Sequence, residues 1–239
     1  MTEVRLTTAD LPASVEPMVE ILPGVHLVDG VDPAPDFTTH VYLVKDKGAS
    51  WTLIDTGLPG AHEKILAYLA KIKVEPTSIK KILVTHLHRD HVGSLKTMIE
   101  KTRARTFAHW IEAAYIACDP KYDGPGTPPA EPVTVDEVVK DGDPIDAAGG
   151  VVAYHTPGHT PGHTSYYQPE RKILFSGDLF FVEGDKLILT VPDFTFHTPT
   201  AKISARRMGQ LAVDSLLTYH GGPVLKSGGS AMRNLVRTL

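Results

Sequence analysis

The residues most suited to chemistry in this 239-residue chain lie in one short segment, THLHRDH at residues 85–91, directly after the apolar run KKILV. Side chains two residues apart point to the same side of an extended strand, so His86 and His88 are expected to face one metal ion. Asp90 and His91 follow where the chain turns toward the next expected helix, and they can reach a neighbouring metal ion. Burying these groups together without a cation would be energetically costly. The segment therefore predicts a metal site rather than a solvated polar loop.

Three further fragments place ligand-type residues after apolar runs, where strands are expected to end. HTPGHTPGH at residues 155–163 contains prolines and glycines that exclude a regular helix, so His159 is expected in a rigid loop of tight turns. SGD ends in Asp178, and YHGGP contains His220. Each fragment alone is weak support, because a lone histidine is more often structural. Together with residues 85–91, however, they give four strand ends that each deliver a ligand-type residue.

The elements that must position these residues follow from the hydrophobic pattern. Short apolar runs alternate with segments whose apolar residues recur at helical spacing. Each half of the chain gives strands followed by helices, which predicts two sheets packed face to face with helices on both outer faces. Strands are expected at residues 25–28, 41–44, 51–54, 81–85, 106–108, 151–154, 164–167, 173–175 and 215–219, and helices at 61–71, 93–101, 111–118, 201–212 and 231–239.

The motifs HLHRDH, TPGHT, SGD and HGGP, in this order, resemble those of the metallo-β-lactamase superfamily, and LIDTG at residues 53–57 resembles its first motif. The resemblance covers about residues 20–225. It implies an α/β fold, the αββα sandwich with two mixed β-sheets flanked by helices, in one domain of residues 1–239. It also implies the ligand sets: His86, His88 and His159 for a first metal ion, Asp90, His91 and His220 for a second, and Asp178 as the bridge between them.

The segment Asp55-Thr56-Gly57 has two interpretations. By resemblance, Asp55 supports the loop that carries the metal ligands. The same three residues also match the signature of aspartic proteases, which need two carboxylates that share a proton. The chain holds only one such motif, so a protease would have to be a symmetric dimer. The metal motifs make this second interpretation unnecessary.

The predicted chemistry follows from two cations that lie a few Å apart. They can share a hydroxide and lower the pKa of the water that forms it to about 7, and one of them polarises the carbonyl or phosphoryl oxygen of the substrate. Asp90 is the predicted catalytic residue, because it would orient the hydroxide and pass a proton to the leaving group. Mixed imidazole and carboxylate ligands suit zinc best, with iron, manganese and cobalt as alternatives.

The expected substrates are small carbonyl compounds: lactones, esters or thioesters. Phe181 stands where lactone-hydrolysing relatives often have tyrosine, which argues against a strict lactonase. The segment after His220 is short for the helical C-terminal part of glyoxalase II-like thioester hydrolases, and Asp178 argues against antibiotic hydrolysis as the native task. The alternatives are a phosphodiesterase, a persulfide dioxygenase with one iron, a β-lactamase and a non-catalytic metal-binding scaffold.

Secondary candidates surround this prediction. His40, His197 and Phe181 are candidates for lining the substrate pocket, and His163 is either a support for the metal site or an ordinary hydrogen-bonded histidine. The segment 119–132, rich in proline and glycine, is expected to overhang the site or to form a subunit contact.

Composition limits the partners and the location. The chain has 28 acidic and 24 basic residues, and a net charge of −4 gives no reason to expect nucleic acid or an anionic membrane. The expected partners are a small-molecule substrate and, in a homodimer, a second copy of the chain. No apolar run approaches the roughly 20 residues that span a bilayer, and the first residues lack a signal-peptide pattern, so a cytoplasmic location is expected. The single cysteine, Cys118, allows neither an internal disulfide nor a thiolate-rich metal cluster.

Overall fold

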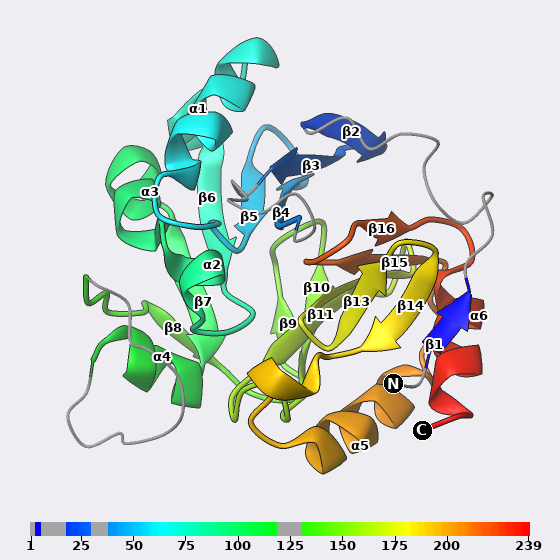
Figure 1. The fold of residues 1–239 in the computed structure, drawn as a ribbon. Coiled ribbons are helices and arrows are strands. Elements are labelled where there is room, and N and C mark those ends of the chain that lie inside the picture. Colours follow the sequence, from blue (N-terminus) through cyan, green and yellow to red (C-terminus); the bar gives the residue numbers. More distant parts are fainter. Residues whose placement is uncertain (1–2, 6–17, 30–37, 119–130) are drawn as a thin grey trace.

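The structure of the chain is a computed structural model that describes residues 3–5, 18–29, 38–118 and 131–239. Most of the segment 119–132 lies outside the described residues, so its expected role near the site stays a prediction. The described residues form four layers, in which two β-sheets face each other and helices cover both outer faces (Figure 1). This is the predicted αββα arrangement of two mixed sheets, with a small additional sheet that the sequence did not reveal.

The first sheet is antiparallel over its first four strands and parallel over the rest. The parallel part arises where helices connect successive strands, as the alternating pattern predicts. The strands, in spatial order, are β2 (Val19–Leu22), β3 (Val25–Asp29), β4 (His40–Lys45), β5 (Trp51–Ile54), β6 (Ile79–Leu83), β7 (Arg105–His109) and β8 (Glu137–Val139).

The second sheet is antiparallel except for one parallel pair, β12 with β15. Its strands, in spatial order, are β16 (Pro223–Val224), β15 (Ser215–Thr218), β12 (Ile173–Gly177), β11 (Thr164–Gln168), β10 (Val151–His155) and β9 (Pro144–Ile145). The additional sheet consists of β1 (Glu3–Arg5), β14 (Lys186–Leu189) and β13 (Phe180–Glu183).

Helices cover the outer face of each sheet (Figure 1). The helices α1, α3 and α4 lie along the first sheet, and α5 and α6 lie along the second. Their bounds are α1 (Ala61–Lys71), α2 (Arg89–Val92), α3 (Leu95–Thr102), α4 (Trp110–Ile116), α5 (Thr198–Met208) and α6 (Gly228–Val236), with short 3₁₀ turns η1 (Pro76–Ser78) and η2 (Pro192–Phe194).

Three apolar cores separate the four layers, and the strands alternate between them. In β4, Val41 and Leu43 belong to the core under α1 and α3, whereas Tyr42 and Val44 belong to the core between the two sheets. Successive side chains of a strand point to opposite faces, so a strand covered on both sides is apolar throughout. For this reason the short strands in the sequence are continuous apolar runs.

The structure differs from the sequence prediction in two places near the functional residues. The strand expected at 81–85 ends at Leu83, because the Thr85 amide donates to the Asp55 side chain (2.8 Å) instead of a neighbouring strand. The hairpin of β13 and β14 was not predicted. The sequence does carry a turn signal there, since Glu183-Gly184-Asp185 separates two apolar runs. In the structure, Gly184 has a φ of 60°, which suits a glycine in a tight turn.

Two buried tyrosines connect the facing sheets beside the predicted ligand segments. Tyr42 of the first sheet donates its hydroxyl to the carbonyl of Thr218 at the end of β15 (2.6 Å). Tyr166 of the second sheet donates to the carbonyl of Val84 just after β6 (2.8 Å). Each tyrosine thus fixes, from the opposite sheet, the backbone that leads into a ligand segment. No helix among the described residues is long and apolar enough to cross a membrane, and the cytoplasmic location stays a prediction.

The connection made by Tyr166 gives a testable prediction. Tyr166→Phe should lower the free energy of unfolding by about 1–2 kcal/mol, because the buried carbonyl of Val84 loses its donor. Denaturant unfolding measures the change. Tyr154→Phe, on the adjacent strand, is the control, because Tyr154 is half-buried and its ring, which packs against Arg207, is kept in phenylalanine. Equal stability of Tyr166→Phe and wild type would show that the connection contributes nothing.

Candidate metal centre

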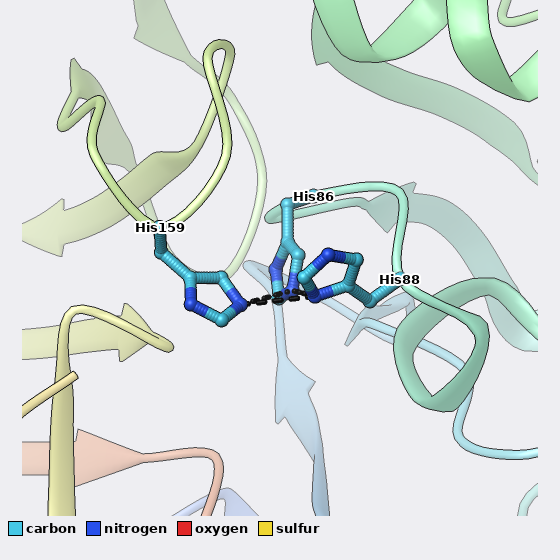
Figure 2. A group of neighbouring side chains, drawn as sticks. All are labelled: His86, His88 and His159. Atoms are coloured by element: carbon cyan, nitrogen blue, oxygen red, sulfur yellow. Dashed lines mark hydrogen bonds between the residues drawn. The ribbon is translucent and has the colours of Figure 1, made fainter. Parts of the chain in front are cut away.

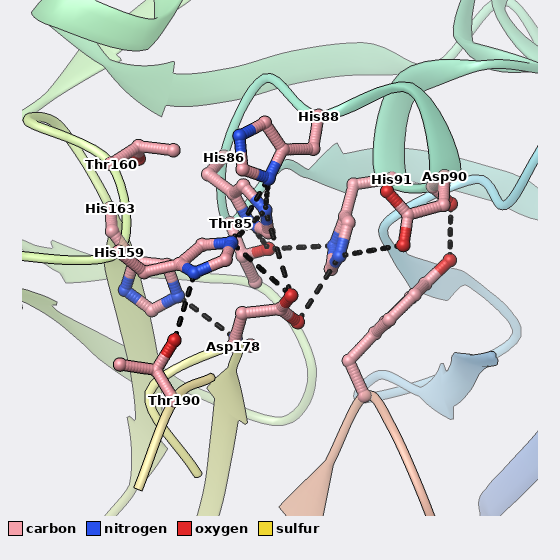
Figure 3. Close-up of polar contacts among 12 residues, drawn as sticks. Thr85, His86, His88, Asp90, His91, His159, Thr160, His163, Asp178 and Thr190 are labelled. Carbon is pink, nitrogen blue, oxygen red and sulfur yellow. Dashed lines mark hydrogen bonds and ion pairs between the residues drawn. The ribbon is translucent and has the colours of Figure 1, made fainter. Parts of the chain in front are cut away.

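The predicted ligand segments meet at one edge of the two sheets. They follow β6, β10, β12 and β15, whose carboxyl ends lie at this edge, and Figure 3 shows the side chains converging from these different strands. All seven predicted ligands are within the cluster. Three sets of residues in the cluster have ligand atoms close enough to hold a metal ion. The first group is His86, His88 and His159, and the second group is Asp90, His91 and His220 together with the neighbouring Asp178. The third set, His86, His91 and Asp178, overlaps both groups.

The first group is a triangle of imidazole nitrogens (Figure 2). His86 Nε2 lies 3.1 Å from His88 Nδ1 and 3.2 Å from His159 Nε2, and the third side, His159 Nε2 to His88 Nδ1, measures 3.0 Å. Tetrahedral zinc with Zn–N distances of about 2.0–2.1 Å would hold its nitrogen ligands roughly 3.3 Å apart. The three nitrogens therefore already have nearly the spacing that one such ion requires.

The protonation of the first group also fits a cation. Burial lowers the pKa of both His86 and His159 well below the ordinary value, and it lowers the pKa of His88 as well. Neutral imidazoles offer lone pairs, and three lone pairs that converge within hydrogen-bond distance cannot all be satisfied by one another. A metal ion at the centre of the triangle would satisfy all three.

The second group combines carboxylates with imidazoles. His220 Nε2 lies 3.3 Å from Asp90 Oδ2 and 3.3 Å from Asp178 Oδ2, and His91 Nε2 lies 3.2 Å from Asp178 Oδ1. The same Asp178 Oδ2 is 3.3 Å from His159 Nε2 of the first group. Asp178 therefore lies between the two groups, which is the position the sequence predicted for a bridging ligand.

The charges of the second group are strongly coupled. Burial lowers the pKa of His220, but Asp178 and Asp90 outweigh burial and raise it to about 9. Burial also opposes the charged form of His91, yet Asp178, Asp90 and Asp55 raise its pKa well above the ordinary value. Without a metal ion, protons on the two imidazoles balance the carboxylates. A bound cation would replace those protons.

Two buried atoms of the second group have no hydrogen-bond partner among the described residues: His91 Nε2 and Asp178 Oδ1. They face each other at 3.2 Å without hydrogen-bond geometry. Buried polar atoms are rarely left without a partner, and those that are require an explanation such as an ion. This pair supports a cation between His91 and Asp178.

In several of these histidines, Nδ1 has a hydrogen-bond partner outside the ligand cluster. This contact orients the ring so that Nε2 points toward the other ligands. His91 Nδ1 donates to Asp55 Oδ2 (2.8 Å), and Asp55 also accepts from the Thr85 hydroxyl (2.7 Å). Asp55 thus supports the ligand loop, as expected. His220 Nδ1 lies 3.1 Å from the carbonyl oxygen of Thr38. Such partners fix the tautomer and the ring orientation of a ligating histidine.

Sequence reasoning missed three supporting residues, each of which contacts a ligand segment distant from it in the sequence. The Thr190 hydroxyl lies 2.9 Å from His159 Nδ1. Tyr219 stacks on the His91 ring at 3.6 Å and donates its hydroxyl to the carbonyl of Asp90. Glu112, on α4, contacts two ligand loops at once. No motif marks Thr190 or Glu112, and although Tyr219 stands in the fragment YHGGP, nothing in the sequence shows that it contacts His91 and Asp90.

His163 supports Asp178 and is not part of the three ligand groups. Its Nε2 accepts the amide of Asp178 (3.0 Å), and its Nδ1 lies 2.8 Å from the Thr156 hydroxyl. Burial lowers the pKa of His163 to about 3, which keeps the ring neutral so that Nε2 can accept. Gly177 permits this contact, because a Cβ there would lie 2.7 Å from His163 Nε2.

The three candidates for pocket lining differ in position. Phe181 stacks on His220 with ring centroids 4.8 Å apart, which makes it an apolar wall of the centre. His40 is buried one residue after Thr39, which forms a bridge with His220. His197 is exposed, and its amide donates to the carbonyl of Gly158 next to His159. Phe181 thus contacts the predicted ligand His220 through its side chain.

Comparison with known proteins places this geometry among metal-dependent hydrolases. Residues 34–229 match the family model of the metallo-beta-lactamase superfamily. The chain is 28% identical over 235 residues to the probable metallo-hydrolase YflN of Bacillus subtilis, a match that covers 84% of this chain and 87% of that protein. It is 30% identical over 180 residues to a hydroxyacylglutathione hydrolase of Pseudomonas aeruginosa, covering 73% of this chain and 60% of that enzyme.

The fold is also that of solved structures. The metallo-beta-lactamase family protein TTHA1429 from Thermus thermophilus superposes with a TM-score of 0.70 at 24% identity, covering 91% of this chain and 80% of that one. At this identity the likeness shows the shared fold.

The two histidines of the TPGH repeat give the first prediction for the site. His159→Ala should remove at least one metal ion per chain, because its Nε2 completes the three-nitrogen triangle. His163→Ala should keep the metal stoichiometry, since His163 accepts the Asp178 amide and packs against the rings of His86 and His159 but belongs to none of the ligand sets. Elemental analysis after dialysis measures both. Loss of metal from His163→Ala with retention by His159→Ala would show that the ligand assignment is wrong.

The raised pKa of His220 gives a second prediction. His220 is protonated below about pH 9 in the metal-free chain, so metal binding at pH 7.5 must expel a proton. The apparent metal affinity should therefore rise with pH up to about 9. Calorimetric titration in two buffers with different ionisation enthalpies counts the protons. In His220→Ala the count should fall, and an unchanged count would exclude His220 as a source.

Proposed function

We propose that this chain, which belongs to the metallo-beta-lactamase superfamily of hydrolases, hydrolyses small carbonyl substrates and binds two divalent metal ions to do so. Lactones and activated esters are the proposed substrates, with thioesters and phosphoesters as weaker ones. The observation that carries the proposal is Asp178, whose Oδ2 lies 3.3 Å from both His159 and His220 and so links two separate ligand groups.

Two metal ions are favoured over one because the second group is complete. Asp90, His91 and His220 are within the spacing of a single ion, and all three are buried or half-buried. A dioxygenase with one iron would need only the group of His86, His88 and His159. A non-catalytic scaffold would not need an exposed acid at the centre, whereas the Asp90 side chain is 27% exposed. Zinc is the proposed metal, because imidazole and carboxylate ligands in nearly tetrahedral spacing suit it.

When bound, the metal ions would acidify a water molecule and polarise the substrate carbonyl. The chain's own residues supply the remaining steps. Burial opposes ionisation of Asp90, but His91 and His220 outweigh burial and lower its pKa, so its carboxylate is ionised. Asp90 is the most accessible carboxylate of the cluster, and it can accept the proton of the attacking water and deliver it to the leaving group. Phe181, stacked on His220, excludes water from that side of the centre.

A substrate with an apolar acyl part is supported by the surface next to His159. Phe194 and Phe196 are 63% and 57% exposed, and the amide of Phe196 donates to the carbonyl of His159 (3.0 Å). The segment that carries these rings is thus attached to a ligand loop. The relative named hydroxyacylglutathione hydrolase also supports an acyl substrate, although this chain spans only 60% of that enzyme.

The metal content tests the first half of the proposal. Protein purified with zinc supplied should contain about two zinc ions per chain, because two ligand groups share Asp178. Elemental analysis of wild type and of Asp178→Asn measures this, and the variant should lose at least one ion. One iron per chain, with the second group unfilled after zinc is added, would instead indicate the dioxygenase.

A substrate panel tests the second half. The metal-loaded enzyme should give its highest kcat/KM on a lactone or an activated ester, and lower values on a thioester, a phosphodiester and a β-lactam. Asp90→Asn should lower kcat by about 100-fold or more, because the proton-transfer group is lost. Glu100→Gln, on the exposed side of α3, is the control. A phosphodiester or β-lactam preferred over every lactone and ester would overturn the substrate assignment and leave the metal centre standing.

A further inference from the structure

Glu112 is a buried carboxylate that the proposed reaction does not use. It lies on α4, and its side chain is fully buried. Its Oε2 accepts the amide of Leu87 (2.7 Å), and its Oε1 accepts both the Thr160 hydroxyl (2.7 Å) and the amide of Gly162 (2.8 Å). Among the ion pairs of the described residues, none includes Glu112. A carboxylate in this position needs a reason, because burying one is energetically costly.

The three donors belong to the two loops that form the first ligand group. Leu87 lies between His86 and His88, and Thr160 directly follows His159. The two oxygens of one carboxylate therefore connect the loop after β6, in the first sheet, with the loop after β10, in the second. Among the hydrogen bonds of the described residues, these loops are also joined by the close approach of His159 to His86 and His88, and Thr164, at the start of β11, donates its amide to the carbonyl of Thr85 (3.0 Å).

The packing around Glu112 shows that the loop after β10 fits closely against it. A Cβ at position 162 would lie 2.7 Å from Glu112 Oε1 and 2.9 Å from Glu112 Cγ. Only glycine allows the backbone this close, so the sequence TPG before His163 serves the contact with Glu112 as well as the turn. The buried Glu112 carboxylate therefore fixes the distance of both loops from α4.

We propose that Glu112 is a positioning residue that fixes the separation of the loops carrying His86, His88 and His159, and thereby the geometry of the first metal group. The proposal rests on the proposed metal-dependent function. Partners that orient metal ligands typically contribute about 10- to 100-fold to metal affinity. The effect of Glu112 should be largest at the first group, because its hydrogen bonds go to the residue between His86 and His88 and to residues that follow His159.

The test uses His220→Ala as background, which impairs the second group and leaves the three-histidine group to be measured. Zinc affinity is determined by competition with a chromophoric chelator. Glu112→Gln keeps the size of the side chain, but its amide N–H₂ faces a donor of at least one loop. In the His220→Ala background it should weaken zinc binding by about tenfold or more, whereas Glu100→Gln should not.

A second pair of variants leaves the buried carboxylate in place, in case Glu112→Gln does not fold. Thr160→Val replaces one of the three donors with a methyl group of nearly the same size, and Thr160→Ser keeps the donor. Thr160→Val should weaken zinc binding in the same background, and Thr160→Ser should restore it. Unchanged zinc affinity in both Glu112→Gln and Thr160→Val would overturn the positioning role while the metal centre stands. Absence of zinc binding by the wild type would overturn the proposed function and this proposal together.

Discussion

The structure depends on one electrostatic constraint: five imidazoles and two carboxylates share a buried space between two sheets. The carboxylates and imidazoles can partly neutralise each other, as the raised pKa of His220 and the lowered pKa of Asp178 indicate. The three nitrogens of His86, His88 and His159 have no such balance, because all three are held neutral by burial. The charges of the cluster therefore favour bound cations, and the spacing of its ligand atoms fits them.

Holding this cluster together requires connections between sheets that are far apart in sequence. Tyr42 and Tyr166 join the facing sheets just before two ligand segments. Asp55 joins Thr85 to His91, and Glu112 joins the loop of His86 and His88 to the loop of His159. Each of these groups is buried and makes hydrogen bonds that water would otherwise supply. The protein thus uses buried polar side chains to fix loops whose own backbone is irregular.

The clustering of the seven candidate ligands was predictable from the sequence, because they lie in short local motifs. These motifs lie next to apolar runs, and the HxHxDH spacing alone brings four of the candidate ligands together. The helix at 61–71 was predicted with both of its ends, since its apolar residues recur at helical spacing. The supports were not predictable in the same way. Glu112 and Thr190 lie in no motif, and the place of Tyr219 beside His220 does not reveal its contact with Asp90, 129 positions away.

The end of β6 illustrates the same limit. Apolar residues up to Val84 predict a strand, but the Thr85 amide is bonded to the Asp55 carboxylate, so the regular ladder stops earlier. A side chain from a different strand ends the element, and no local pattern encodes that. The loop that carries His86 and His88 begins where β6 ends and the contact with Asp55 replaces strand pairing. The irregular backbone of this loop is what allows its side chains to point toward the metal centre.

The proposed centre is one cluster that holds two metal ions linked by Asp178. Anomalous X-ray diffraction at the zinc edge, from crystals of zinc-loaded protein, tests it most directly. The account predicts two peaks, one among the nitrogens of His86, His88 and His159 and one among Asp90, His91 and His220, with Asp178 in contact with both. A single peak at full zinc loading, or peaks that do not touch Asp178, would contradict it.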